Sequence, residues 1–174
     1  VTVSATAHAK VNLHLGCGDV RDDGFHELVT IFQSLSLPTT VTLTEVPDGD
    51  ASGHVAELTV SGDSAAHVPV DDSNLAWRAV IAAVEKAESR VPRVAAIHIE
   101  KAIPVAGGMA GGSADAAAAL VAAREFFELP LTDDELLELA ADLGSDVPFC
   151  LLGGTALGTG RGENLAPLLV RGEY

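Results

Sequence analysis

A glycine-rich stretch at residues 104–115 holds the residue types and spacing best suited to chemistry. Four glycines stand there in two adjacent pairs, Gly107-Gly108 and Gly111-Gly112, and an alanine-rich run follows at residues 116–123. Because alanine favours helices and glycine does not, the pattern predicts a loop that ends where a helix begins near Ser113. A loop with so little side-chain bulk lets a ligand reach the backbone, and the unpaired N–H groups of a first helical turn attract anions. The stretch therefore predicts a phosphate-binding loop.

Two common phosphate-binding signatures do not fit this loop. The Walker pattern places a lysine after its final glycine, whereas Ser113 follows Gly112 here. The dinucleotide fingerprint requires G-x-G-x-x-G, a spacing that the paired glycines miss. A tight turn packed against a neighbouring strand is the alternative interpretation, because glycine-rich turns are common.

Alternating polar and apolar residues between Lys10 and Cys17 provide further candidates. A period of two predicts a half-buried strand whose polar face carries Lys10, Asn12 and His14. A lysine and an asparagine two residues apart on one face could both reach a single ligand. An ordinary solvated strand face is the alternative.

Four more residues have types and positions that suit ligand contact. Phe25 and His26 open a β-rich run at residues 28–37, where an aromatic ring and an imidazole could recognise a base, or form a core plug and a surface histidine. Lys101 stands between a predicted strand at 94–99 and the glycine loop. Asp146 precedes Pro148, and its alternative role is the N-cap of the apolar segment 149–152.

The elements that must position these residues can be outlined from the same patterns. Residues 41–46 and 55–60 predict a pair of antiparallel strands, and Asp72 or Ser73 can cap a helix over 74–88. Thr132 and Glu135 form a capping box for a helix that ends near Gly144. The glycine-rich segment 153–162 predicts a hairpin or a strand edge.

Composition limits the classes of function. The chain has 174 residues, 48% of them apolar, and a formal net charge of −15 with ten lysines and arginines, which disfavours nucleic-acid binding. Its length suits one domain or one lobe. Cys17 and Cys150 have no metal-type spacing and predict two buried free thiols in a reducing cytosol. We also expect no membrane span, and therefore a cytoplasmic protein.

Three separated segments, 9–13, 104–116 and 144–149, together resemble the GHMP kinases, a superfamily named after galacto-, homoserine, mevalonate and phosphomevalonate kinases. Within it, residues 21–28 resemble the signature of kinases that act on a cytidine diphosphate-linked methylerythritol in the non-mevalonate route to isoprenoids. The resemblance implies an α+β lobe similar to domain 2 of ribosomal protein S5, with a mixed or antiparallel sheet and helices on one side. Members continue past residue 174 into a second lobe, so the chain is expected to be the N-terminal lobe only.

The resemblance also implies ATP and Mg²⁺ as cofactors and transfer of the γ-phosphate to the 2-hydroxyl of the methylerythritol. Asp146 would then be the base and Lys10 would lie between the acceptor oxygen and the phosphoryl group. Asn12 would hold the polyol, while Phe25 would stack on the cytosine and His26 would hydrogen-bond its edge. The residues implied to bind ATP are Asn74, Lys101, Pro104, Val105, Ala106, Gly107, Gly108, Met109, Ala110, Gly111, Gly112, Ser113 and Ala114, with Ser113 also a candidate Mg²⁺ contact.

Two other functions remain open at this point. A different kinase of the same superfamily could act on another small alcohol, although residues 24–26 argue against it. A non-catalytic binding lobe or an RNA-associated module is the second, and the acidic charge disfavours RNA. The oligomeric state is not predicted.

Overall fold

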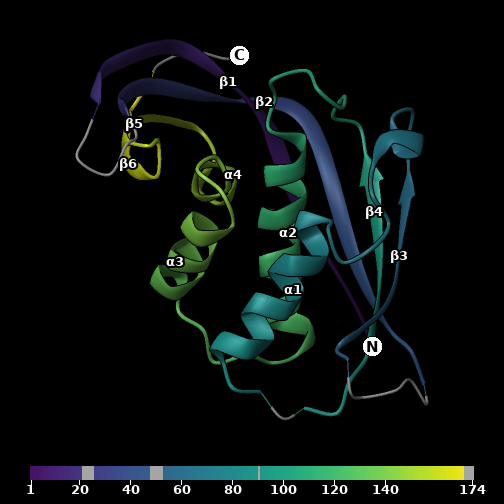
Figure 1. Ribbon diagram of the computed structural model, residues 1–174. Coiled ribbons are helices and arrows are strands. Elements are labelled where there is room, and N and C mark those ends of the chain that lie inside the picture. The colour runs from purple at the N-terminus through teal and green to yellow at the C-terminus, as the bar shows by residue number, and fades with distance from the viewer. Residues whose placement is uncertain (21–25, 48–52, 90, 171–174) are drawn as a thin grey trace.

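A mixed β-sheet with helices on one face makes up the computed structural model of the protein, which describes residues 1–20, 26–47, 53–89 and 91–170 (Figure 1). The expected α+β class, with a mixed sheet and helices on one side, is confirmed. The strands are β1 (Thr2–Val20), β2 (His26–Glu45), β3 (Val55–Ser61), β4 (Ala95–Lys101), β5 (Thr155–Gly160) and β6 (Asn164–Pro167). The helices are the 3₁₀ turn η1 (Ala65–His67), α1 (Leu75–Lys86), α2 (Gly111–Phe126), α3 (Asp133–Leu143) and α4 (Val147–Leu152).

Strand β2 organises the sheet because three other strands pair with it. Its one edge pairs antiparallel with β1, and its other edge is divided between two partners. Residues 28–33 pair with β5 and residues 39–45 pair with β4, so the sheet splits at residues 34–38. Lys10 of β1 lies opposite Ser34, at this split. The split therefore brings the segment after β4 and the segment before β5 close to Lys10.

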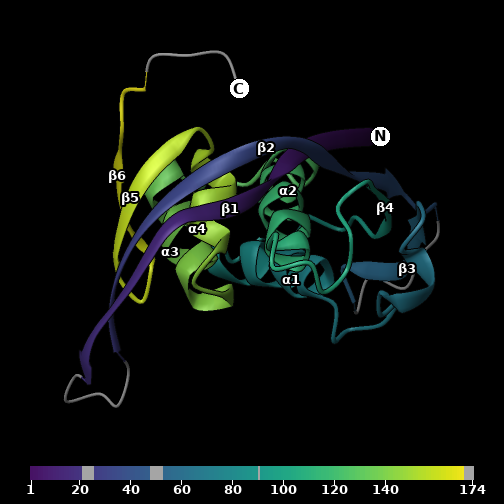
Figure 2. The same ribbon diagram turned by 90° about the horizontal axis from the view of Figure 1, so that it is seen from above.

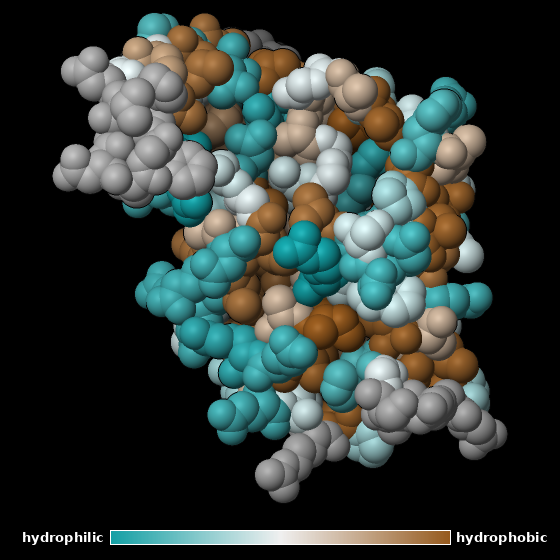
Figure 3. Space-filling model, in the orientation of Figure 1, coloured by the Kyte–Doolittle hydropathy of each residue, from teal (hydrophilic) through white to brown (hydrophobic). Residues whose placement is uncertain are grey.

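The helices fill the concave side of the curved sheet, as the view from above shows (Figure 2). Helix α2 is central and buries mostly alanine, whose small side chain allows close packing of α1 and of strands β1 and β2. The main core also takes Leu43, Ile97, Val80 and Leu120 from four different elements. The outward surface over α3 is largely hydrophilic (Figure 3), in keeping with its acidic residues.

A second, smaller core supports the split region. Phe32 of β2 and Phe149 of α4 are fully buried and stack with ring centroids 4.8 Å apart. Such a stack contributes about 0.5–1.5 kcal/mol beyond the burial of its surface. It fixes α4 against the sheet close to Lys10, whose ammonium nitrogen lies 5.4 Å from the Phe32 ring centroid.

Several local expectations are confirmed. Thr132 and Glu135 form the reciprocal capping box of α3, and Gly144 is its C-cap residue. The segment from 153 to 162 contributes β5 and the turn into β6, which form a hairpin. By contrast, the predicted strands at 28–37 and 41–46 are not separate, because both belong to the single strand β2.

Other expectations were wrong. Residues 41–46 and 55–60 do not pair with each other, because β4 lies between them and pairs parallel with β3. The helix expected near Ser113 does form, but it begins two residues earlier, at Gly111. The cap of α1 is Asn74 itself, whose side chain accepts from the Ala76 N–H. Cys17 is exposed, although a buried thiol was expected, while Cys150 is buried as expected.

The sidedness of β1 was also predicted wrongly. Ala7 and Ala9 face the core, and a register shift between His8 and Lys10 then turns Lys10 inward as well. A bulge has this effect because one extra residue changes which side of the strand the next residues face. Leu13 and Leu15, expected to face the core, are 63% and 61% exposed, where the β1–β2 hairpin extends beyond the helices (Figure 2).

Candidate active site

The loop between β4 and α2 has an unusual backbone. Gly108 has the left-handed conformation (φ 69°) expected of a glycine, but Ala106 (φ 62°) and Ala110 (φ 56°) share it. A left-handed alanine costs roughly 1–2 kcal/mol, so contacts elsewhere must hold the loop in place. Two such contacts reach a carbonyl of the loop and the carbonyl of the first residue of α2. The backbone N–H of Lys10 donates to the Met109 carbonyl at 3.1 Å, and the Lys101 ammonium donates to the Gly111 carbonyl at 3.0 Å.

A cleft of about 400 Å³ lies along this loop. Of the residues expected to bind ATP, Asn74, Lys101 and the whole run 104–112 line it, whereas Ser113 and Ala114 are not among its lining residues. The cleft also has a wall that the sequence did not suggest. This wall comes from the turn η1, the segment before α1 and the first residue of α1, namely His67, Val68, Pro69, Ser73 and Leu75. Residues 65–73 have no pattern that distinguishes them from an ordinary polar connection.

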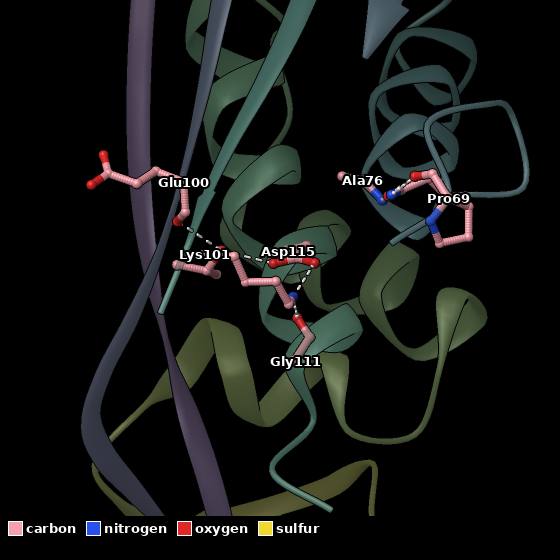
Figure 4. A network of polar contacts seen from close by, with 8 residues as sticks. Pro69, Ala76, Glu100, Lys101, Gly111 and Asp115 are labelled. Atoms are coloured by element: carbon pink, nitrogen blue, oxygen red, sulfur yellow. Dashed lines mark hydrogen bonds and ion pairs between the residues drawn. The ribbon is translucent and has the colours of Figure 1, made fainter. Parts of the chain in front are cut away.

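Asn74 shapes that wall through its amide. Its side-chain oxygen accepts from the Ala76 N–H at 2.8 Å, and its side-chain nitrogen donates to the Pro69 carbonyl at 2.7 Å (Figure 4). The residue is buried. Its amide therefore ties the start of α1 to the segment that lines the cleft.

Lys101 lies at the floor of the cleft rather than at its surface. Its ammonium forms an ion pair with Asp115 of α2, and both side chains are almost completely buried (Figure 4). The other carboxylate oxygen of Asp115 accepts from the Thr39 hydroxyl at 2.8 Å. Neither Asp115 nor Thr39 was predicted to take part in the site.

Lys10 and Asp146 meet beside the loop. The Lys10 ammonium lies 3.1 Å from the Asp146 carboxylate, and its side chain is 7% exposed while that of Asp146 is 33% exposed. Asp146 occupies the N-cap position of α4, but its side chain makes no capping hydrogen bond. The carboxylate is thus directed to Lys10, which favours a chemical role over the capping alternative.

Asn12 is held between Lys10 and a buried threonine. Its side-chain oxygen accepts from the Lys10 ammonium at 2.8 Å, and its nitrogen donates to the Thr30 hydroxyl at 2.7 Å. Thr30 in turn donates to the His14 carbonyl at 2.7 Å. This chain of hydrogen bonds orients the Lys10 ammonium, and Thr30 is a member that the sequence did not indicate.

Two predicted substrate residues cannot be placed in this geometry. Phe25 lies outside the described residues, and so does the side chain of His26, whose backbone begins β2. The remaining predicted residues come together: Lys10, Asn12 and Asp146 at one end of the glycine loop, and Asn74 and Lys101 along the cleft.

The described part of the chain has neither a cluster of metal ligands nor a membrane-spanning helix. No group of three or more His, Cys, Asp or Glu side chains gathers there in a metal-binding arrangement. Among the helices of residues 1–20, 26–47, 53–89 and 91–170, none has the length and apolar character needed to cross a membrane.

Comparison with known families and curated proteins gives a consistent result. Residues 74–154 match the family model described as GHMP kinases N terminal domain. The chain is 54% identical over 179 residues to a 4-diphosphocytidyl-2-C-methyl-D-erythritol kinase of Corynebacterium diphtheriae, a match that covers 99% of this chain and 58% of the relative. The enzyme of the same name from Cutibacterium acnes is 51% identical over 177 residues, covering 100% and 56%. The chain thus spans little more than half the length of these relatives.

Solved structures give the same match. A crystal structure of 4-(cytidine 5'-diphospho)-2C-methyl-D-erythritol kinase aligns with a TM-score of 0.74 and 37% identity, covering 97% of this chain and 56% of that one. Methanococcus jannaschii mevalonate kinase aligns with a TM-score of 0.71 at 12% identity, covering 98% and 56%. The latter likeness concerns the fold alone.

Proposed function

We propose that this chain, whose residues 74–154 match the N-terminal domain of GHMP kinases, forms the ATP-binding part of a 4-diphosphocytidyl-2-C-methyl-D-erythritol kinase. Such an enzyme would transfer the γ-phosphate of ATP to the 2-hydroxyl of its substrate. The names of relatives that are 51–56% identical support this substrate, as does the motif at residues 21–28. The proposal includes a second lobe, outside this chain, that completes the enzyme.

The position of Lys10 is the observation that carries the proposal. Its backbone N–H donates to the glycine loop at Met109, while its ammonium lies within 3.1 Å of the Asp146 carboxylate. One residue thus links the group that would hold the triphosphate to the group that would accept a proton. Phosphoryl transfer depends mainly on such positioning and on stabilisation of charge.

The proposed mechanism gives each group one task. The loop amides and the start of α2 hold the phosphates of ATP, because their N–H groups and the helix dipole favour negative charge. Asp146 accepts the proton of the attacking hydroxyl. Lys10 stabilises the negative charge that develops on the acceptor oxygen and on the phosphoryl group in flight. Asn12 and Thr30 keep the Lys10 ammonium at its place between the two.

Mg²⁺ is proposed to enter with ATP. Mg²⁺ in phosphoryl-transfer enzymes takes most of its ligands from phosphates and water, and needs only one or two protein groups. The lack of a carboxylate cluster in the described residues fits that requirement. Both oxygens of Asp115 are already engaged by Lys101 and Thr39, so the Ser113 hydroxyl in the first turn of α2 is the protein group we assign to the metal. When bound, Mg²⁺ would neutralise charge on the phosphates.

Substitution of the two proposed catalytic groups in the complete protein tests the reaction. Asp146→Asn and Lys10→Ala should each abolish turnover of ATP with the cytidylyl substrate, with losses of at least 10²-fold, while ATP still binds. Binding is followed by calorimetry and turnover by release of ADP. A variant that keeps a kcat near that of the unsubstituted protein would remove the role assigned to its residue.

A ligand competition tests the proposed base recognition by Phe25 and His26. If these residues read cytosine, CDP should compete with the substrate and UDP should not. Equal competition by both nucleotides would contradict the cytidine assignment and favour another small-alcohol kinase of the superfamily, which a panel of alcohol substrates with ATP would then identify.

A further inference from the structure

A buried ion pair below the glycine loop has no task in the mechanism above. Lys101 is the last residue of β4 and Asp115 lies in α2, and their side chains are only 2% and 3% exposed. The Asp115 carboxylate accepts from the Lys101 ammonium and from the Thr39 hydroxyl. The ammonium also donates to the Gly111 carbonyl, and Figure 4 shows Lys101 between Asp115 and Gly111. Burying two charges is costly, and an apolar pair of similar volume usually gives equal or greater stability. The pair therefore calls for a reason beyond the stability of the fold.

The surroundings of Lys101 are shaped to keep its ammonium in one place. A Cβ added to Gly111 would lie 3.2 Å from the Lys101 ammonium nitrogen and 3.2 Å from a methyl group of Ile103. A Cβ added to Gly62 would lie 2.1 Å from the Lys101 carbonyl oxygen. Glycine thus allows close contact with both the side chain and the backbone of this lysine, and Gly111 belongs to the Gly111-Gly112 pair of the loop.

The contacts to the loop determine which way its peptide groups face. In a planar trans peptide, a carbonyl and the N–H of the next residue point in opposite directions. The Met109 carbonyl is turned to the Lys10 backbone and the Gly111 carbonyl to the Lys101 ammonium. The N–H groups of Ala110 and Gly112 are therefore directed away from these two lysines. Lys101 donates to the carbonyl of the Gly111–Gly112 peptide, in the first turn of α2.

Charge gives the pair a second effect. Asp115 lines the floor of the cleft, and an uncompensated carboxylate there would repel a phosphate group. Lys101 neutralises it at direct contact, so the backbone amides above them remain the dominant dipoles at the loop. The Thr39 hydroxyl fixes the carboxylate from the opposite side, from strand β2.

We propose that Lys101, held by Asp115 and Thr39, is a positioning residue that orients the Gly111–Gly112 peptide toward a nucleotide phosphate and does not itself bind the nucleotide. This replaces the expectation that Lys101 binds ATP directly. The proposal rests on the proposed function, because it concerns how the loop binds the phosphates of ATP. On this proposal, the protein retains the buried ion pair because the pair sets the geometry of the loop.

A paired substitution separates this role from a structural one. In Lys101→Met/Asp115→Leu, both charges are replaced by apolar side chains, so the protein should keep a melting temperature near that of the unsubstituted protein. Its affinity for ADP should nevertheless fall about tenfold or more, because the Gly111 carbonyl has lost its contact with the ammonium and the loop must be ordered on binding. The KM for ATP should rise while kcat at saturating ATP changes little. Calorimetry with ADP and steady-state kinetics of the complete protein measure these quantities.

Two outcomes would overturn the proposal. One is a double variant that binds ADP as tightly as the unsubstituted protein, which would make the pair purely structural. The other is an unchanged ADP affinity in the matched variant Thr39→Val. This substitution releases the Asp115 carboxylate with little change of shape, and it keeps the test usable if the double variant does not fold. We expect Thr39→Val to weaken ADP binding by about threefold to tenfold. Failure of the proposed function itself would give a different result, because the unsubstituted protein would then bind neither ADP nor ATP.

Discussion

Removal of one hydroxyl group, in Thr30→Val, should impair the reaction without touching the cleft. Thr30 is fully buried, and its hydroxyl both accepts from the Asn12 side chain and donates to the His14 carbonyl, each at 2.7 Å. Valine preserves the shape of threonine but leaves both partners without this bond. The Asn12 amide is then free to rotate, and the Lys10 ammonium loses its fixed acceptor.

The size of both effects follows from this geometry. An unsatisfied buried polar group costs about 1–3 kcal/mol, and because Asn12 and His14 are partly accessible to water, we expect about 1–2 kcal/mol in the free energy of unfolding. A displacement of a catalytic group by 1 Å can cost about 10²-fold in rate, so we expect kcat to fall roughly 10- to 100-fold. The KM for ATP should be unchanged, since Thr30 is not among the residues that line the cleft.

Thr42→Val is the matched control. Thr42 lies on the same strand, and its hydroxyl bonds to that of Ser4 at 2.8 Å on the exposed side of the sheet. Urea denaturation and steady-state kinetics of both variants in the complete protein make the comparison. A Thr30→Val variant with normal kcat, whatever its stability, would show that Lys10 does not depend on this chain of hydrogen bonds.

Three further predictions concern other parts of the molecule. Gly111→Val should weaken ATP binding at least tenfold, because its side chain would displace the buried lysine and isoleucine beneath the loop; calorimetry that shows unchanged affinity would argue against the loop as phosphate site. Burial raises the pKa of the Cys150 thiol to about 12, so iodoacetamide at pH 8 should label the exposed Cys17 and leave Cys150 unmodified in the native protein. Mass spectrometry of the labelled peptides measures this, and labelling of both thiols at equal rates would contradict the buried environment of Cys150. Hydrogen bonds from the backbone and side chain of Thr132 lower the pKa of Glu135. The contribution of the Glu135 carboxylate to the free energy of unfolding should therefore be present above the ordinary pKa of 4.5 and disappear as the pH falls through the lower folded value. A Glu135→Gln variant whose loss of stability is the same at pH 7 and in strong acid would refute this.

The glycine loop and the capping box of α3 could be predicted from the sequence because their signals are local. Glycine followed by alanine marks the loop and the start of α2 within about two residues, and Thr132 with Glu135 marks the start of α3. The overall class followed from the resemblance of separated segments to a known family. Each of these depends on residues that are close together in the chain.

The parts that could not be predicted depend on contacts between distant segments. The bulge that turns Lys10 toward the helices is set by the pairing of β1 with β2, and alternation alone gave the opposite side of the strand. Thr39 stands in a run of threonines, and only the pairing of β2 with β4 shows that it faces Asp115 while its neighbour lies on the other side. The parallel pairing of β3 with β4 likewise depends on the path of the chain through α1, which lies between the two strands in the sequence.

Strand β2 continues without a break past the split in the sheet, and its length therefore sets the distance between the two ends of the site. Phe32 marks the end that supports α4 and the proposed base, and Thr39 marks the end that supports the phosphate loop, so their separation is set by a count of residues in one extended strand. Inserting a single residue between them would lengthen the strand by about 3.3 Å and reverse which side of it the following residues face. Evolution of this lobe should therefore accept changes of residue type along that segment far more readily than changes of its length.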